Sequence, residues 1–250
     1  MTWGFMSVAH IVSLVAGIVG IAVLYLILKD RRETTKTAVL AVLSFSGMAA
    51  IIYNLLAWNS PLEYLPLHLC SLNAMVLPIA VITKNKVLNN LLLLWSLGAL
   101  FALIMNTSVA DTELFGPVFC FYYFPHVCEL GIPILMFSLG LVKKDVKCIA
   151  STMTITALAY TAIHFINLAV NSYAEKHNIL DSSLNVIKVN YMYSITPENP
   201  LLELFYRVIP HRYWYMYLSF VVIAVYLLAV YAPDIVRLIR ARRSQKTFAA

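Results

Sequence analysis

Charged residues are scarce in this sequence. Only 12% of its 250 residues are Asp, Glu, Lys or Arg, 61% are hydrophobic, and the mean hydropathy is +0.80. A soluble domain is usually about one quarter charged and about half apolar. The composition therefore excludes an ordinary soluble protein and predicts one whose solvent is lipid. The length leaves no room for a separate soluble domain, so we expect one integral membrane domain over residues 1–250.

Cysteine is also scarce, and two common zinc-binding patterns are missing. The sequence has 4 cysteines and contains neither a CxxC nor an HExxH motif. We therefore expect no bound metal and no cofactor. One alternative stays open, because five residues could in principle assemble a metal site: His68, Cys70, His126, Glu129 and His164.

Long apolar runs take up most of the chain. A membrane-spanning helix needs about 20 mostly apolar residues. Seven runs approach this length, at about residues 8–28, 37–57, 67–83, 87–106, 118–142, 148–170 and 213–232. They predict an all-α, polytopic transmembrane bundle of about seven helices. The N-terminus lacks a basic segment and a small-residue cleavage site, so we expect the first helix to be a retained anchor.

The basic residues occupy alternating loops. Only four of the 18 lysines and arginines, Lys176, Lys188, Arg207 and Arg212, fall in the other set of loops. The rest lie in one set and in the C-terminal tail: Lys29, Arg31, Arg32, Lys36, Lys84, Lys86, Lys143, Lys144, Lys147, Arg237, Arg240, Arg242, Arg243 and Lys246. Short basic loops stay in the cytoplasm. The distribution predicts a multi-pass protein of the cell membrane with its N-terminus outside and its C-terminus in the cytoplasm.

With this orientation, the polar residues inside the spans collect near the outer leaflet. The main members of this set are His68, Cys70, Asn73, Asn106, His126, Glu129, His164 and Asn167. Taken singly, each could be an ordinary hydrogen-bond partner between helices. Ionisable residues within a span, however, usually face a bundle interior or a wet cavity. We therefore expect a polar cavity that opens toward the outer leaflet and is walled by the third, fifth and sixth predicted helices.

Cys70 is the candidate nucleophile in this set. A thiol is a good nucleophile only as a thiolate, and a neighbouring imidazole can take its proton. His68 is two residues away, so it points off another side of the helix or lies in the preceding turn. A partner from another helix is better placed, which favours His126 or His164.

The long loop over residues 171–212 contains a predicted helix of its own. Asn199 and Pro200 are a suitable N-cap and first helical residue, and Pro210 ends the segment. The apolar residues share one face, which predicts a short amphipathic helix at about 200–209. Two interpretations stay open: a helix that lies on the outer leaflet as a lid, with Arg207 or Arg212 near lipid phosphates, or a packed cap over the bundle.

Several segments resemble one known family. The segment LPLHLCSLNAMVLPIAVITKN at 65–85 resembles the hallmark of bacterial YwaF-type membrane proteins and of their animal relative, transmembrane protein 164. The resemblance continues in FPH at 124–126, NYMYSITPENPLL at 190–202 and the WY pair at 214–215. It covers most of the chain from the third predicted helix onward, whereas the first two helices match only in kind.

The resemblance implies an acyltransferase that acts on membrane lipids through an essential cysteine and histidine. It also implies kinship to intramembrane hydrolases of fatty acid esters of hydroxy fatty acids, whose nucleophile is threonine. The cysteine of PLHLC corresponds to Cys70 and the histidine of FPH to His126. The implied location is a bacterial cytoplasmic membrane, and the implied partners are phospholipids and lysophospholipids, with no nucleic acid.

The expected mechanism is nucleophilic, with His126 as the base for Cys70. Glu129 or His164 could orient His126, and the oxyanion donor could be one of three amides: Asn73, Asn106 or Asn167. Acyl-CoA is cytoplasmic while the expected site faces outward, so the acyl donor is predicted to be a phospholipid. The acceptor is a lysolipid hydroxyl in a transacylase or water in a lipase. Two non-catalytic alternatives remain, a lipid-binding or small-molecule receptor and a transporter.

Overall fold

The structure is a computed structural model that describes residues 2–57, 60–105, 112–181 and 184–248. These residues are mostly helical, in agreement with the predicted all-α class. The helices are α1 (Val8–Leu28), α2 (Glu33–Ser44), α3 (Ser46–Ala57), α4 (Leu69–Thr83), α5 (Lys86–Met105), α6 (Pro117–Ser138), α7 (Cys148–His177), α8 (Pro200–Val208) and α9 (Tyr217–Phe248). Two strands, β1 (Thr2–Trp3) and β2 (Thr112–Glu113), pair antiparallel, and two 3-10 turns, η2 (Tyr191–Tyr193) and η3 (Trp214–Met216), precede α8 and α9.

The chain is a multi-pass membrane protein. Six described segments are long and apolar enough to cross a membrane: Val8–Leu28, Glu33–Ala57, Lys86–Met105, Pro117–Ser138, Cys148–His177 and Trp214–Arg240. The remaining predicted span, the third at about 67–83, corresponds to α4, which is apolar but has only 15 residues. At 1.5 Å per residue it covers about 22 Å, less than the roughly 30 Å of a hydrocarbon core.

The second predicted helix is interrupted. Instead of one helix over 37–57, α2 ends at Ser44 and α3 begins at Ser46. The Ser44 hydroxyl donates to the Ala41 carbonyl at 2.6 Å, and the Phe45 backbone N–H bonds the Val42 carbonyl at 3.3 Å. Serine side chains compete in this way with the regular backbone bonds of a helix. The interruption lies within the span, between its two helical halves.

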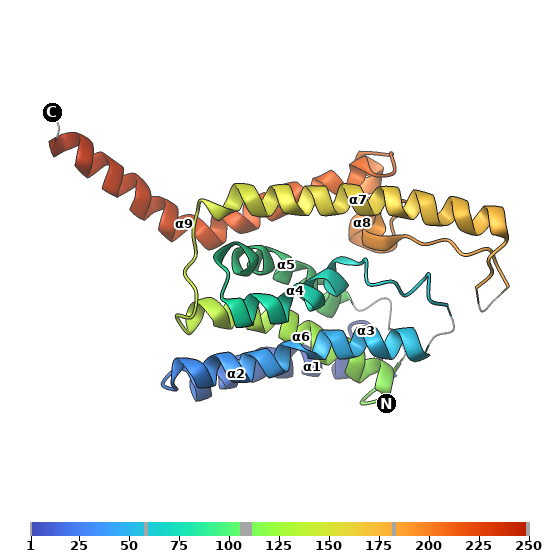
Figure 1. Cartoon of the computed structure of the whole chain (residues 1–250), viewed down its shortest axis with the longest axis horizontal. Helices are drawn as coiled ribbons and strands as arrows, with labels where there is room; N and C mark the ends of the chain where they lie inside the picture. Colours follow the sequence, from blue (N-terminus) through green and yellow to red (C-terminus); the bar gives the residue numbers. More distant parts are fainter. Residues whose placement is uncertain (1, 58–59, 106–111, 182–183, 249–250) are drawn as a thin grey trace.

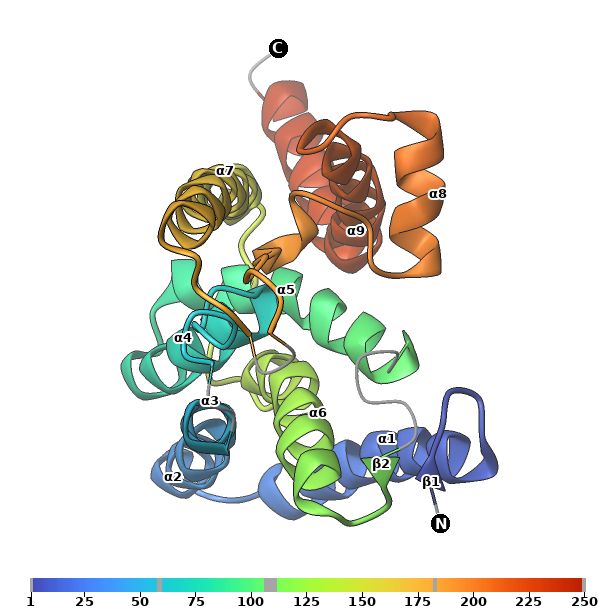
Figure 2. The same cartoon turned by 90° about the vertical axis from the view of Figure 1, so that its right-hand side faces the viewer.

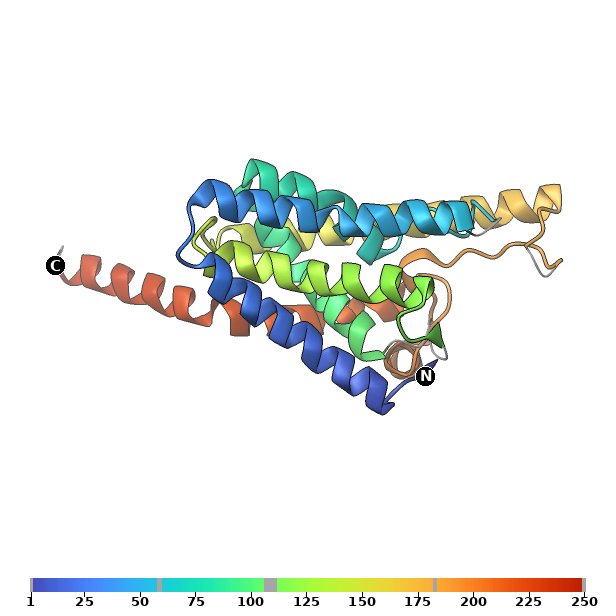
Figure 3. The ribbon, with the colours of Figure 1, turned by 90° about the horizontal axis from the view of Figure 1, so that it is seen from below.

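The sixth and seventh helices are longer than the sequence predicts. α7 continues beyond residue 170 to His177, because Asn171 bonds both backbone groups of Val189 at 2.7 and 2.9 Å and so belongs to a packed helix. It ends where Asn178 adopts a left-handed conformation with φ of 50°. α9 runs to residue 248 rather than 232, since arginine and lysine are good helix formers. Its last turns extend away from the bundle (Figures 1 and 3).

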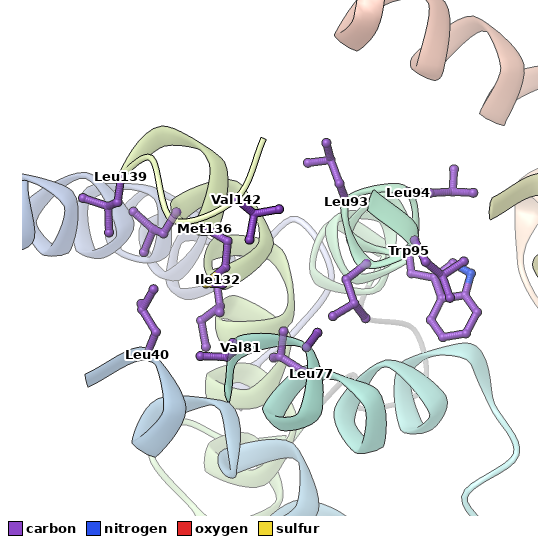
Figure 4. Close-up of a cluster of buried hydrophobic side chains, with 14 of the residues drawn as sticks. Leu40, Leu77, Val81, Leu93, Leu94, Trp95, Ile132, Met136, Leu139 and Val142 are labelled. Carbon is purple, nitrogen blue, oxygen red and sulfur yellow. The ribbon is translucent and has the colours of Figure 1, made fainter. Parts of the chain in front are cut away.

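The helices are arranged in layers. α7 and α9 lie on one side, α4 and α5 lie in the middle, and α1, α2, α3 and α6 lie on the other side (Figure 1). Seen from the end, α5 lies between α6 and the pair formed by α7 and α9, and α8 flanks α9 (Figure 2). The main hydrophobic core lies where α4, α5 and α6 meet, around Leu77, Leu92 and Ile132 (Figure 4 labels Leu77 and Ile132). α1, by contrast, exposes many apolar side chains, as expected for a surface that faces lipid.

The basic loops gather at one end of the bundle. Ion pairs link these loops to one another and to α9: Lys84 with Glu33, Lys86 with Asp145, and Lys144 with Asp234 at 3.1 Å. We call this the basic end, formed by residues 29–36, 84–86, 139–147 and the C-terminal half of α9. The N-terminus, α8 and the loop between α7 and α9 lie at the opposite end, the loop end (Figure 1). The alternating basic loops thus lie together at one end of the bundle. Which side of the membrane each end faces stays a prediction.

Candidate functional site

A cavity of about 260 Å³ lies at the loop end of the bundle. Its lining comes chiefly from α5 and α9, with contributions from α4, α7 and α8, and most of the lining side chains are apolar. α5 lines it from Leu94 to Met105, which at 1.5 Å per residue is a length of about 16 Å. The cavity is therefore elongated along α5, and its apolar lining suits an extended apolar chain.

The prediction of which helices wall the cavity is only partly correct. The sequence predicts a polar cavity between the helices now labelled α4, α6 and α7, whereas this cavity is mainly apolar and α6 contributes Tyr122 alone. The reason is the position of α5, which packs against both α6 and α7 and so separates the two predicted walls (Figure 2). The amphipathic helix α8 covers the cavity through Leu201, Leu202 and Phe205, which favours the interpretation as a packed cap.

Cys70 lies in the cavity lining. It occupies the first turn of α4, its side chain is half-buried, and its sulfur is not part of a disulfide. The thiol lies within electrostatic range of the Glu129 carboxyl and of the Tyr193 hydroxyl. The predicted nucleophile is thus accessible from the apolar cavity and has two titratable neighbours.

Tyr193 is a polar cavity residue that the sequence did not single out. It belongs to η2, in the loop before α8, and lines the same cavity as Cys70. Burial, together with the nearby Cys70 and Glu198, raises the pKa of Tyr193 to about 12. The phenol therefore stays protonated at neutral pH and can donate a hydrogen bond. Its place within NYMYS carries no local signal of this contact, which arises only when the loop folds back onto α4.

His126 is buried on α6, next to the cavity but not in its lining. Its Nδ1 lies 2.6 Å from the backbone carbonyl of Tyr122, one turn earlier. A carbonyl can only accept, so Nδ1 carries the proton, and Nε2 of the neutral ring carries the lone pair. The ring also packs against the Tyr122 ring, with 4.4 Å between centroids. No hydrogen bond joins His126 to Cys70, although the structure describes both side chains.

Asn73 and Glu129 are buried close to Cys70. Their side chains are 1% and 3% exposed. Within the described part of the chain, three of their side-chain atoms have no hydrogen-bond partner: Oδ1 and Nδ2 of Asn73, and Oε2 of Glu129. Gly47 of α3 lies against both helices, because a Cβ added to it would lie 2.5 Å from Ala74 Cβ and 3.3 Å from Glu129 Oε1. We call Ser46, Asn73 and Glu129 the three-helix cluster.

His164 and Asn167 belong to a different cluster. The Asn167 amide donates at 2.8 Å to the Tyr191 carbonyl and to Ser194 Oγ, and its oxygen accepts from the Tyr191 N–H at 3.0 Å. His164 Nδ1 lies 3.0 Å from the same Ser194 hydroxyl. We call His164, Asn167 and Ser194 the α7–loop cluster. It fixes η2 to α7, and none of its members lines the cavity.

The remaining predicted residues are more peripheral. His68 is the N-cap of α4, lines the cavity and contacts the rings of Tyr191 and Tyr193 at 5.6 Å. Arg207 and Arg212 are exposed at the loop end, outside the cavity lining. Asn106 lies outside the described residues.

The five residues considered for a metal do not form a metal site in this structure. Among the residues that the structure describes, no group of three or more His, Cys, Asp and Glu side chains could hold a metal ion. They are instead divided between the cavity, α6 and the α7–loop cluster.

The chain was compared with known protein families, curated proteins and solved structures. Residues 5–230, which are most of the chain, match the TMEM164 family. No curated protein matches, and no solved structure matches. The matched range includes Cys70, His126 and every residue that lines the cavity. The chain therefore belongs to the TMEM164 family.

Proposed function

We propose that this protein transfers acyl groups between membrane lipids, with Cys70 as the nucleophile. The observation that carries the proposal is the position of this thiol in the lining of an elongated apolar cavity under an amphipathic helix. An acyl chain suits such a cavity, because apolar surfaces gain free energy when water leaves them. The resemblance of residues 65–85 to lipid acyltransferases points to the same chemistry.

In the first proposed step, the Cys70 proton moves to Nε2 of His126, and the thiolate attacks the carbonyl carbon of a phospholipid ester. His126 then returns the proton to the departing alkoxide, which leaves as a lysophospholipid, and the acyl group stays on Cys70 as a thioester. In the second step, the hydroxyl of another lysolipid gives its proton to His126 and attacks the thioester. The thiolate leaves and regains a proton.

The proton transfer needs a change from the geometry that the structure shows. Cys70 and His126 are not hydrogen-bonded here, and catalytic hydrogen bonds often tighten only when substrate is bound. The lone pair on Nε2 of His126 is available for this role, because Nδ1 is held by the Tyr122 carbonyl. We assign oxyanion stabilisation to the Tyr193 hydroxyl, since Tyr193 lines the same cavity as Cys70 and interacts electrostatically with its thiol.

The proposed acyl donor is a phospholipid. The cavity lies at the loop end, and the basic residues predict that this end faces away from the cytoplasm, where acyl-CoA is found. Arg207 and Arg212 are exposed at the same end and suited to lipid phosphates. A bacterial cytoplasmic membrane would supply such donors and acceptors.

The test is acyl exchange by purified protein in nanodiscs, with a labelled phospholipid and an unlabelled lysophospholipid. We expect Cys70→Ala to lower the exchange rate by about 10³-fold or more. The matched control is Cys120→Ala, which removes an exposed thiol elsewhere on the outer part of α6 and should leave exchange unchanged. Equal exchange by wild type and Cys70→Ala would contradict the proposal.

A second candidate is a non-catalytic lipid-binding receptor or transporter. The observation that favours it is the missing hydrogen bond between Cys70 and His126. The same assay separates the two functions, because a binding protein retains labelled lipid in the cavity but exchanges no acyl group in the wild type.

A further inference from the structure

The three-helix cluster contains several buried polar atoms without partners. Oγ of Ser46, Oδ1 and Nδ2 of Asn73, and Oε2 of Glu129 are all inaccessible to solvent, and no described group bonds them. Leaving one buried polar atom unpaired costs about 1–3 kcal/mol. An unpaired carboxylate in an apolar interior costs more still, unless a charge of opposite sign lies beside it. The cluster as described is therefore incomplete.

These side chains come from three helices that pack together at Gly47. Gly47 follows Ser46 on α3, and its backbone packs against Ala74, the neighbour of Asn73 on α4. Glu129 Oε1 lies against the same glycine. Ser46 also lies beside the Cys128 thiol, which precedes Glu129 on α6. The close approach at Gly47 thus holds together the parts of α3, α4 and α6 that carry the hydroxyl, the amide and the carboxyl.

The cluster lies where a membrane span is interrupted. α2 ends at Ser44 and α3 begins at Ser46, so Ser46 is the first residue of the second half-helix. Interrupted spans in membrane proteins expose backbone groups that bind small ions, while the surrounding helices exclude lipid. The Ser46 hydroxyl lies at such an interruption.

We propose that the three-helix cluster binds one sodium ion. The ligands would be Glu129 Oε2, Asn73 Oδ1 and Ser46 Oγ, all of them hard oxygen donors of the kind that such cations prefer. One carboxylate balances one positive charge, whereas a divalent cation would leave a net charge in a low-dielectric core. Nδ2 of Asn73 can donate to a water molecule bound to the ion. Each of the four unpaired atoms then has a partner.

The proposal is independent of acyl transfer and is tested without a lipid substrate. The experiment measures thermal unfolding of the purified protein in nanodiscs, as NaCl replaces choline chloride at constant ionic strength. A ligand that binds only the folded state raises the unfolding temperature with its concentration, here by about 5 °C or more at saturation. We expect this rise in the wild type and its loss in Glu129→Gln.

Two further variants keep the test decisive. Glu203→Gln removes an exposed carboxyl from α8 and should respond to sodium as the wild type does. Ser46→Ala removes one neutral ligand and covers the case in which Glu129→Gln does not fold. We expect it to shift the half-saturating sodium concentration upward by about 10-fold.

Several outcomes would overturn the proposal. A wild type whose unfolding temperature is the same in NaCl and in choline chloride has no sodium site, and its Glu129 would then be a protonated carboxyl. A rise that Glu129→Gln retains would place the ion elsewhere. A rise that KCl produces as strongly as NaCl, and that Ser46→Ala leaves unchanged, would reduce the effect to general salt stabilisation.

Discussion

The two buried polar clusters differ in one respect, their hydrogen bonding. In the α7–loop cluster, Asn167 uses both its amide nitrogen and its amide oxygen, and His164 contacts the Ser194 hydroxyl. In the three-helix cluster, four polar atoms have no partner among the described residues. Satisfied polar groups hold a fold together, whereas unsatisfied ones in a native core mark a site that something else completes. The comparison assigns a structural role to the first cluster and a binding role to the second.

Between the two clusters lies the proposed reaction site. Cys70 faces the cavity and Glu129 of the three-helix cluster, while Tyr193 reaches the cavity because the α7–loop cluster holds η2 in place. The α7–loop cluster therefore positions one wall of the site without touching the cavity. Four predictions follow, from the largest expected effect to the smallest, and the first three test this division.

The sharpest comparison is between the two buried histidines. We expect His126→Ala to lower the acyl exchange rate by about 10²–10⁴-fold, the usual contribution of a general base. His164→Ala should lower it by less than about 10-fold, because His164 contacts Ser194 in the α7–loop cluster and takes no part in the proposed proton transfer. Exchange assays on both variants in nanodiscs check this. Equal losses would show that both histidines serve catalysis and would end the division between the clusters.

The Tyr193 hydroxyl gives the next effect. Loss of one oxyanion donor usually lowers kcat by about 10²–10³-fold. We therefore expect Tyr193→Phe to lower kcat by a factor in this range and to leave KM little changed. The control is Tyr191→Phe in the same turn, because the Tyr191 hydroxyl donates to the Leu62 carbonyl. If Tyr191→Phe reduces kcat as strongly as Tyr193→Phe, the effect comes from the conformation of η2 and not from the oxyanion.

The two buried asparagines separate structure from binding by stability alone. Asn167→Ala leaves backbone groups of Tyr191 unpaired, so we expect the free energy of unfolding to fall by about 3 kcal/mol. Asn73→Ala in sodium-free buffer removes no hydrogen bond and should cost about 1 kcal/mol or less. Denaturant unfolding of both variants in choline chloride measures the difference. Equal costs would mean that Asn73 has a partner in solution.

The smallest effect lies at the basic end, where charges are paired but near the surface. The hydrogen bond from Lys86 and its charge hold the pKa of Asp145 below its usual value of about 3.9. Because the folded state binds the proton less tightly than the unfolded state, the pair stabilises the protein above pH of about 4. This stabilisation disappears as the pH falls through the lowered pKa.

Asp145→Asn should therefore lower the free energy of unfolding by at most about 1 kcal/mol at pH 7, as for other exposed pairs. The difference between variant and wild type should shrink as the pH falls below about 4. Unfolding curves at several pH values measure it. A difference that persists at the lowest pH would point to the backbone contact of Asp145 with Lys147 and not to its charge.

The architecture was largely predictable because its signals are local. Apolar runs of about 20 residues predict spans wherever they occur, and alternating basic loops predict that these loops meet at one end. The break at Phe45 was missed because it depends on one serine bond, and the extension of α7 was missed because Asn171 finds its partner in Val189. A polar residue is easily predicted to lie in a loop when its hydrogen-bond partner is far away in the sequence.

The all-α membrane class, the clustering of basic loops and the list of polar residues near one end follow from composition and local pattern. Which of these polar residues meet depends on where α5 lies, and this is known only from the folded chain. By packing between α6 and α7, α5 separates His126 from His164 and makes the cavity apolar. The contacts that distinguish the two clusters join residues far apart in the chain, such as Asn167 with Tyr191 and Gly47 with Glu129. Periodicity and composition describe each segment alone, so they carry no information about such pairs.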